Sequence, residues 1–172
     1  MTISAELKAV YATAPVDRYY IETLTLTHPI FIEGDNSRGD FFMTNQRDGF
    51  TGTLEDSRVV EFQPVPFTAI PPNAEEQSDV QLAVGLDNSS RQLMEYIEKL
   101  GETPNVPIVV TYRVYLSDDL NTVQNDPPLI LDIISVRATQ QLISFTAGNS
   151  NQRDKPFPSQ LYTTDLFPGL AR

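Results

Sequence analysis

The sequence predicts one mainly β domain spanning residues 1–172: an antiparallel β-sandwich or β-barrel with one crossing α-helix and a short N-terminal helix. Three observations lead to this fold class. Eight or nine segments have the residue pattern of a strand, whereas only two have that of a helix. No repeat or low-complexity tract separates them. The chain has 172 residues, enough to bury a sizeable core as one domain.

At the amino terminus, Thr2 or Ser4 can cap a helix from Ala5 to about Thr13, and Pro15 ends it. Its expected apolar stripe is Leu7, Val10, Tyr11 and Ala14. The next segment, 18–27, alternates and is rich in aromatic and β-branched residues. It is therefore predicted as the first strand, near a sheet edge, with 30–32 continuing as strand.

Short strands follow in a region rich in Gly, Asp and Pro. The predicted segments are Phe41–Gln46, Thr51–Leu54, Val59–Gln63 and Phe67–Ile70. Proline cannot donate a ladder hydrogen bond, so the prolines at 64, 66, 71 and 72 keep this region out of a central sheet position.

The stretch 79–116 has the most complete pattern, because strand, helix and strand follow one another with their end signals. Four apolar residues two apart define the first strand: Val80, Leu82, Val84 and Leu86. Ser89 and Gln92 form a capping box for a helix that ends by Leu100, with Leu93 and Ile97 on its apolar stripe. Such a short helix needs tertiary cover, so we expect it to cross the sheet.

The strand after this helix, Ile108 to Leu116, is predicted to lie in the core. One side of it carries Val110, Tyr112, Val114 and Leu116. A polar loop follows, and Leu129–Arg137 with Gln140–Gly148 form a predicted hairpin. The last residues, about 150–172, are aromatic and proline-bearing without periodicity, which favours a docking tail.

Composition limits the classes of function. Twelve Lys and Arg against 23 Asp and Glu give a net charge of −11, which disfavours direct nucleic-acid binding and attachment to a membrane surface. No 18-residue apolar run or signal-peptide pattern is found, so we expect a soluble protein without membrane insertion, made in a cytoplasm.

Few residue types for catalysis are present. The chain has no cysteine and only one histidine, His28. This composition excludes Cys-His catalysis and multi-histidine metal sites, and the sequence does not support a Ser-His catalytic pair. Paired carboxylates remain, with Glu22, Asp48, Glu55 and Asp132 as candidates. Their abundance is not a signal, so we predict no enzyme, no catalytic residue, no cofactor and no metal site.

Several segments carry a resemblance to a known family. In order, they are YATAPVDRYYIETLTLTHPIF, LEDSRVVEFQPVPFTAIPP, DVQLAVGLDNSSRQL, PIVVTYRVYLSDD and FPSQLYTTDLFPGL. They resemble a family of bacteriophage and prophage tail proteins of unknown function, and are more distantly similar to the amino-terminal part of the minor tail protein L of lambda-like siphophages. The likeness runs from about Tyr11 to Leu170, and is most specific at 112–115 and 167–170.

This resemblance implies a structural subunit of a tail tip or baseplate in the virion, synthesised in the host bacterial cytoplasm. The subunit would form a trimeric or hexameric ring that connects the tail tube or distal tail protein to the central hub. Larger relatives carry a cysteine-bearing extension with an iron-sulfur cluster, which this cysteine-free chain does not match. A glycan-binding β module and a cell-wall hydrolase using carboxylates are the alternatives.

The expected interface residues lie in two places. The tail contributes Phe157, Tyr162, Phe167 and Leu170, and the loop from Ser117 to Pro128, with Asp118 and Asp119, is expected to face a partner. Aromatic residues anchor many interfaces. The alternative is that the tail aromatics close the core of their own subunit.

Truncation after Ser159 distinguishes these two roles of the tail. If the tail docks on neighbours, the shortened chain folds as a monomer, by circular dichroism and gel filtration, but does not enter particles. An unfolded product would contradict docking and support a role in the core.

Overall fold

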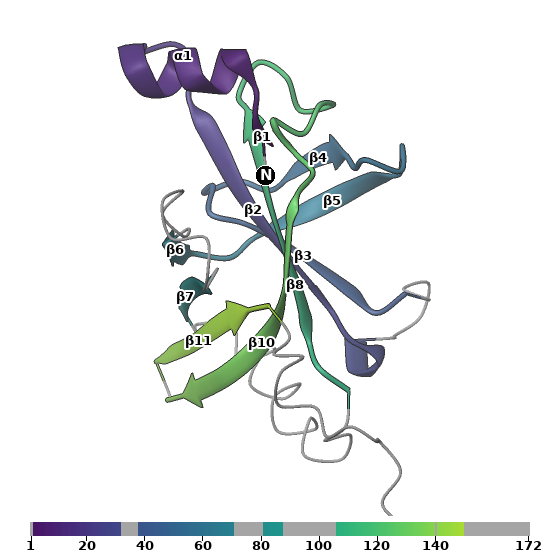
Figure 1. The fold of residues 1–172 in the computed structure, drawn as a ribbon. Coiled ribbons are helices and arrows are strands. Elements are labelled where there is room, and N and C mark those ends of the chain that lie inside the picture. The colour runs from purple at the N-terminus through teal and green to yellow at the C-terminus, as the bar shows by residue number, and fades with distance from the viewer. Residues whose placement is uncertain (1, 32–37, 71–80, 88–105, 140, 150–172) are drawn as a thin grey trace, which may run out of the picture.

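The computed structural model describes residues 2–31, 38–70, 81–87, 106–139 and 141–149. Within them the protein is mainly β, as predicted (Figure 1). The elements are β1 (Thr2–Ile3), α1 (Ala5–Thr13), β2 (Tyr20–Thr27), the 3₁₀ turn η1 (Pro29–Phe31), β3 (Asp40–Thr44), β4 (Phe50–Thr53), β5 (Val59–Pro64), β6 (Phe67–Ile70), β7 (Gln81–Asp87), β8 (Val109–Leu116), β9 (Asn125–Asp126), β10 (Leu129–Ala138) and β11 (Leu142–Gly148).

Nine strands form one open sheet in the order β4-β5-β3-β2-β8-β10-β11-β7-β6, and β1 pairs separately with β9. The neighbours pair antiparallel, except that β3 and β5 run parallel over two residue pairs. The sheet does not close into a barrel. It folds on itself, which gives the sandwich-like arrangement that the sequence predicts.

Strand β10 makes this folding possible because its two halves belong to different layers. Residues 129–132 pair with β8, whereas 132–138 pair with β11. The register shifts between Ile133 and Ser135, and such an irregularity bends a strand and increases its twist. In Figure 1, β10 accordingly leaves β8 and runs with β11. The first layer is then β3, β2 and β8, and the second is β11, β7 and β6.

The main core lies between these layers and confirms two predicted faces, except that Val80 of the second face lies outside the described residues. On β8, Val110, Tyr112, Val114 and Leu116 are all almost completely buried. On β7, Leu82, Val84 and Leu86 face the same cluster, together with Ile143 and Phe145 of β11. Each fully buried side chain of this kind contributes about 1.5 to 3 kcal/mol, so this core is the main source of stability.

Helix α1 closes one end of the core and has the predicted bounds. The Ser4 hydroxyl accepts a hydrogen bond from the Leu7 amide, and the chain leaves the helix at Ala14 with a φ of 43°. Leu7 is buried with Val10, whereas Tyr11 is 49 % exposed and Ala14 is also exposed. The predicted stripe is therefore wrong for its last two members, because the short helix covers only the end of the sandwich.

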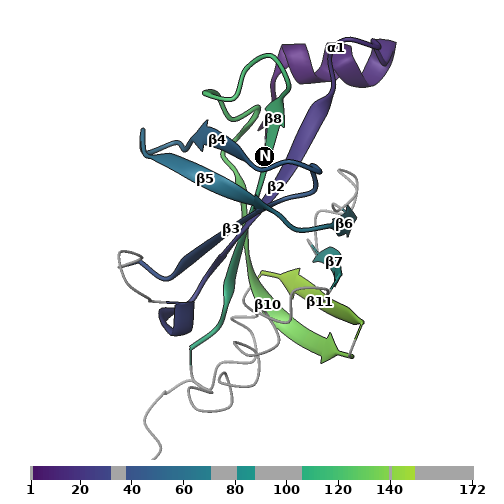
Figure 2. The ribbon, with the colours of Figure 1, turned by 180° about the vertical axis from the view of Figure 1, so that it is seen from behind.

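A second, smaller core lies on the other face of the first layer. The β4–β5 hairpin folds over this face, and Figure 2 shows it crossing β2 and β8 obliquely. Phe62 is fully buried there. Its ring stacks on Phe50 at 4.9 Å and meets Phe42 and Tyr115 edge-on, each at 5.7 Å. The Tyr115 hydroxyl donates to the Thr53 carbonyl at 3.0 Å. Aromatic packing thus holds the hairpin to the sheet.

Two predictions about the first strand are wrong. Strand β2 lies between β3 and β8 rather than near an edge. Its second face is covered by the hairpin, which local sequence does not reveal. The segment expected to continue as strand instead forms η1, in which the Phe31 amide donates to the His28 carbonyl. Pro29 starts this turn and has no amide for a ladder.

The loop after β8 is more structured than predicted. It contains β9, and the buried Asn125 side chain accepts from the Val114 amide at 2.8 Å and donates to the Tyr112 carbonyl at 3.0 Å. These bonds fix the second half of the loop on its own chain. A partner can therefore contact chiefly the exposed turn that precedes it.

Most other strand predictions are confirmed within one or two residues. They include the 129–148 hairpin, whose strands pair antiparallel, and the outer positions of β4 and β6 in the strand order. The crossing helix predicted at 89–100 and the tail at about 150–172 lie outside the described residues.

We predict that Phe62→Ala lowers the free energy of unfolding by about 3 to 5 kcal/mol, because it leaves a cavity among the three aromatic rings of Phe42, Phe50 and Tyr115. Val59→Ala on the same strand is the control. Val59 is 68 % exposed, so its loss costs at most about 0.5 kcal/mol. Urea unfolding of the purified variants measures both, and equal losses would contradict a second core.

Candidate functional site

The predicted tail residues Phe157, Tyr162, Phe167 and Leu170 lie outside the described part of the chain, so their role stays a prediction. Asp118 and Asp119 lie in the turn after β8. The Asp118 carboxylate accepts from Arg18 Nε at 2.8 Å, and Arg18 also donates to Glu6 of α1 at 2.5 Å. Asp119 accepts from the Asn121 amide at 3.0 Å. Both carboxylates therefore have local structural partners.

The candidate carboxylates for hydrolysis are not gathered at one place. Glu22 lies on the core side of β2, where it accepts from the Tyr112 hydroxyl at 2.8 Å and from Asn45 Nδ2 at 3.1 Å. Glu55 pairs with Arg113 on the opposite face of the sheet. Asp48 is exposed in the turn before β4, and Asp132 lies on β10. Their positions form no pair across a common cleft.

The single histidine is buried rather than open to a ligand. His28 is 1 % exposed, its Nε2 is 3.2 Å from the Val106 carbonyl oxygen, and its ring meets Phe31 edge-on at 6.2 Å. Across the described ranges, no group of three or more acidic or histidine side chains could hold a metal ion. Nor does any helix there have the length and apolarity needed to cross a bilayer.

Two surface features remain as candidate sites, and the first is the outer side of the second layer. We call it the open face and define it by two rows of residues across β6, β7, β11 and β10. The first row is Thr68, Gly85, Ser144 and Arg137, and the second is Ile70, Ala83, Thr146 and Ser135. Directly paired residues share one side of a sheet, so each row runs across all four strands.

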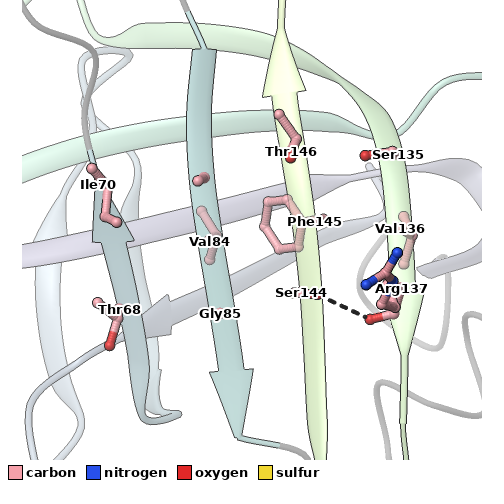
Figure 3. A pocket seen from close by; sticks show the side chains of 11 residues that line it. Thr68, Ile70, Val84, Gly85, Ser135, Val136, Arg137, Ser144, Phe145 and Thr146 are labelled. Carbon is pink, nitrogen blue, oxygen red and sulfur yellow. Dashed lines mark hydrogen bonds between the residues drawn. The ribbon is translucent and has the colours of Figure 1, made fainter.

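The open face is a shallow hollow because its middle residues are small. These rows line a cavity of about 510 Å³. In Figure 3, Thr68 and Ile70 lie on one outer strand and Arg137 on the other, with β7 and β11 between them. A Cβ built at Gly85 would meet only the Leu142 side chain, at 3.9 Å, so the floor is open. Ile70 and Leu142 are 64 % and 50 % exposed.

The second feature lies on the hairpin side of the first layer, and we call it the arginine cleft. It has a volume of about 370 Å³ and is lined by Thr25, Thr27, Arg38, Asp40, Phe42, Leu54, Arg58, Thr111 and Arg113. Its floor is formed by polar side chains of β2 and β8. One wall is formed by Arg38, which precedes β3, and by Asp40, the first residue of β3. The other wall is formed by the turn of the β4–β5 hairpin.

Arg113 joins the floor of the arginine cleft to the hairpin. Its Nε lies 2.8 and 3.1 Å from the two carboxylate oxygens of Glu55, and its Nη1 donates to the Thr25 hydroxyl at 2.8 Å. Arg58 forms ion pairs with Asp56 at 2.5 Å and Asp40 at 3.5 Å. The hydrogen bond from Arg58 holds the pKa of Asp56 below its ordinary value.

Neither surface was predicted from the sequence. A signal for the cleft exists, because Arg113 and Thr111 interrupt an apolar run predicted as a core strand, and a buried arginine needs a partner. The open face has only small and polar residues at alternate positions. That pattern is also typical of a solvated face.

The described elements define a mainly β, sandwich-like domain with one open sheet face and one charged cleft. The chain belongs to the family described as "Domain of unknown function (DUF1833)", whose model matches residues 6–162. A comparison with curated proteins finds no match.

We predict a loss of stability above pH 10 that depends on Tyr112. Burial, followed by the nearby charge of Glu22, raises the pKa of Tyr112 well above its ordinary value. The contribution of the protonated Tyr112 hydroxyl to the free energy of unfolding is complete below the unfolded-state pKa of about 10. This contribution is lost as the pH rises toward the folded-state pKa. Urea unfolding between pH 8 and 11 should give a slope that Tyr112→Phe reduces by up to about 1.4 kcal/mol per pH unit. Equal slopes would contradict this.

Proposed function

We propose that this chain is a structural subunit of a siphophage-type tail tip or baseplate. It forms a trimeric or hexameric ring that connects the tail tube or distal tail protein to the central hub. The resemblance of five sequence segments motivates the tail assignment. The structural observation that supports a binding role is the open face, where all eight residues of the two rows are exposed or partly exposed.

The residues of the open face suit a protein contact. Its two rows contain one charged residue, Arg137. Ile70 in the second row is 64 % exposed, and Leu142, two residues before Ser144 on the same side of β11, is 50 % exposed. Interface centres are depleted of charge and need close approach of backbones, which small side chains allow. A stable contact buries about 800 Å² on each partner, which is compatible with a face four strands wide.

A closed ring needs two different surfaces on each copy, one for each neighbour. The open face includes β6, which ends the strand order, and the β4–β5 hairpin lies at the other end. The two surfaces therefore belong to opposite ends of the sheet. This separation supports a ring in which the open face of one copy meets the hairpin side of the next.

The acidity of the chain fits the same function. A ring around a tail channel must let the genome pass. A negatively charged channel surface does not bind DNA, because the DNA is negatively charged as well. The net charge of −11 motivates this part of the proposal. A reconstruction of the assembled tip with a basic lumen at this ring would contradict it.

A glycan-binding role is the second candidate, and exposed tyrosines favour it. Tyr11, Tyr19 and Tyr20 are 41 to 51 % exposed, and the rings of Tyr11 and Tyr20 lie 5.0 Å apart. Their planes are inclined by 56°, so the two rings do not form one flat platform for a sugar. A glycan array with the purified chain tests this role, and the absence of any hit would remove it.

We predict that the pair Ile70→Lys and Leu142→Lys prevents incorporation into particles while the chain stays folded. The added charges would be desolvated at the contact, whereas in the free chain both positions are exposed to water. Val59→Lys, at an exposed position on β5, is the control. Complementation of a phage or prophage lacking the gene, followed by immunoblotting of purified particles, measures the effect. Normal incorporation of the double variant would contradict the use of the open face.

A further inference from the structure

The arginine cleft contains hydrogen-bond donors that the described residues do not use. A guanidinium carries five N–H groups. Arg113 uses Nε for Glu55 and one N–H of Nη1 for Thr25, and the described residues offer no partner to Nη2. The side chain of Arg113 is only 10 % exposed. Buried donors normally have a partner, so water or a group from outside the described residues is expected to meet these.

Thr111 gives an independent indication on the floor of the same cleft. It is 7 % exposed and lines the cavity. It pairs with Thr25 across β2 and β8, on the side of the sheet that carries Arg113. None of the described residues forms a hydrogen bond with its hydroxyl. A buried hydroxyl without a partner costs about 1 to 3 kcal/mol, so a valine of similar shape would be expected here if nothing bound.

The charges around the cleft indicate what kind of group it accepts. Three of the 12 Lys and Arg of this acidic chain line it, namely Arg38, Arg58 and Arg113. Arg38 is 62 % exposed at the wall and makes a long contact of 3.4 Å with Asp56. Guanidinium groups bind carboxylates through paired N–H bonds, and a hydroxyl adds a further donor. Asp40, Glu55 and Asp56 already offset the charges of these arginines. What the cleft offers to an oxyanion is therefore the remaining N–H and hydroxyl donors.

We propose that the arginine cleft binds a carboxylate carried by a second copy of this chain. Copies with a net charge of −11 repel one another, so a contact between them is favoured where one copy presents arginines to an acidic side chain of the next. An exposed carboxylate lies beside the open face, which meets the hairpin side of the next copy in the proposed ring: Asp87 pairs with Leu142 across β7 and β11 and forms no ion pair with a described residue. The choice of a second copy as the source rests on the proposed ring.

The site also explains the position of the hairpin. Glu55 and Arg58 belong to the hairpin turn, whereas Arg113 and Thr111 belong to β8. A carboxylate in the cleft would contact the hairpin and the sheet at once. Binding would therefore strengthen the contact between hairpin and sheet in the same step as it joins two copies.

The test is sedimentation velocity of the full chain over a wide concentration range. Thr111→Val and Arg38→Gln are the test variants, because neither breaks the Arg113–Glu55 pair. Arg47→Gln is the matched control, since Arg47 is exposed on the turn between β3 and β4 and makes no ion pair with a described residue. We expect the wild-type chain to self-associate, both test variants to weaken the association at least about tenfold, and the control to match the wild type.

Thermal unfolding separates loss of binding from loss of folding. If Thr111→Val keeps or raises the melting temperature of the monomer and still weakens association, the hydroxyl serves the contact. A wild-type chain that stays monomeric at concentrations up to about 0.1 mM overturns the proposal. A Thr111→Val chain that associates like the wild type overturns it as well.

Competition by small anions tests the chemistry of the bound group. Sodium acetate should weaken association more than sodium chloride of equal ionic strength. Inorganic phosphate in place of acetate tests for a free anion: if it raises the melting temperature without changing association, the source is a free phosphate, and the second-copy proposal is overturned.

Failure here and failure of the proposed function give different results. If the test variants associate normally and the chain is found in particles, the cleft proposal is wrong and the tail function survives. If association depends on Arg38 and Thr111 but the chain is missing from particles, the carboxylate site survives and the tail function is wrong.

Discussion

The bend in β10 is the constraint on which the rest of the structure depends. One strand pairs with β8 through its first residues and with β11 through its last, so the two layers are parts of one sheet and cannot separate. Their facing sides bury the main core, and helix α1 closes its end through Leu7 and Val10. The same bend turns the other side of β11, β7 and β6 outward, which creates the open face.

The β4–β5 hairpin completes the first layer in a different way. It lies over the sheet, where Phe62 packs on Phe50, Phe42 and Tyr115, and only the end of β5 pairs with β3, through two parallel residue pairs. A Cβ at Gly49, just before the hairpin, would lie 2.7 Å from the Phe62 carbonyl oxygen, so only glycine allows this approach. The aromatic cluster covers one part of the outer face, and the arginine cleft occupies the part next to it.

Local patterns predicted what depends on neighbours in sequence. Alternation predicted the core side of β8 and β7, and capping residues predicted both ends of α1. The central position of β2 was missed because it depends on a hairpin that arrives some 30 residues later and hides its second face. The cleft was missed for the same reason, since Arg113 and Glu55 are 58 residues apart. The open face could not be identified, because small polar residues indicate a surface but not its use.

The central claim is that this chain builds a ring at a tail tip. Electron cryomicroscopy of the tail tip of the phage or prophage particle that encodes it tests this most directly. The account predicts density for three or six copies around the hub, with the open face of each copy covered by its neighbour. Particles whose tips lack this chain would contradict the claim.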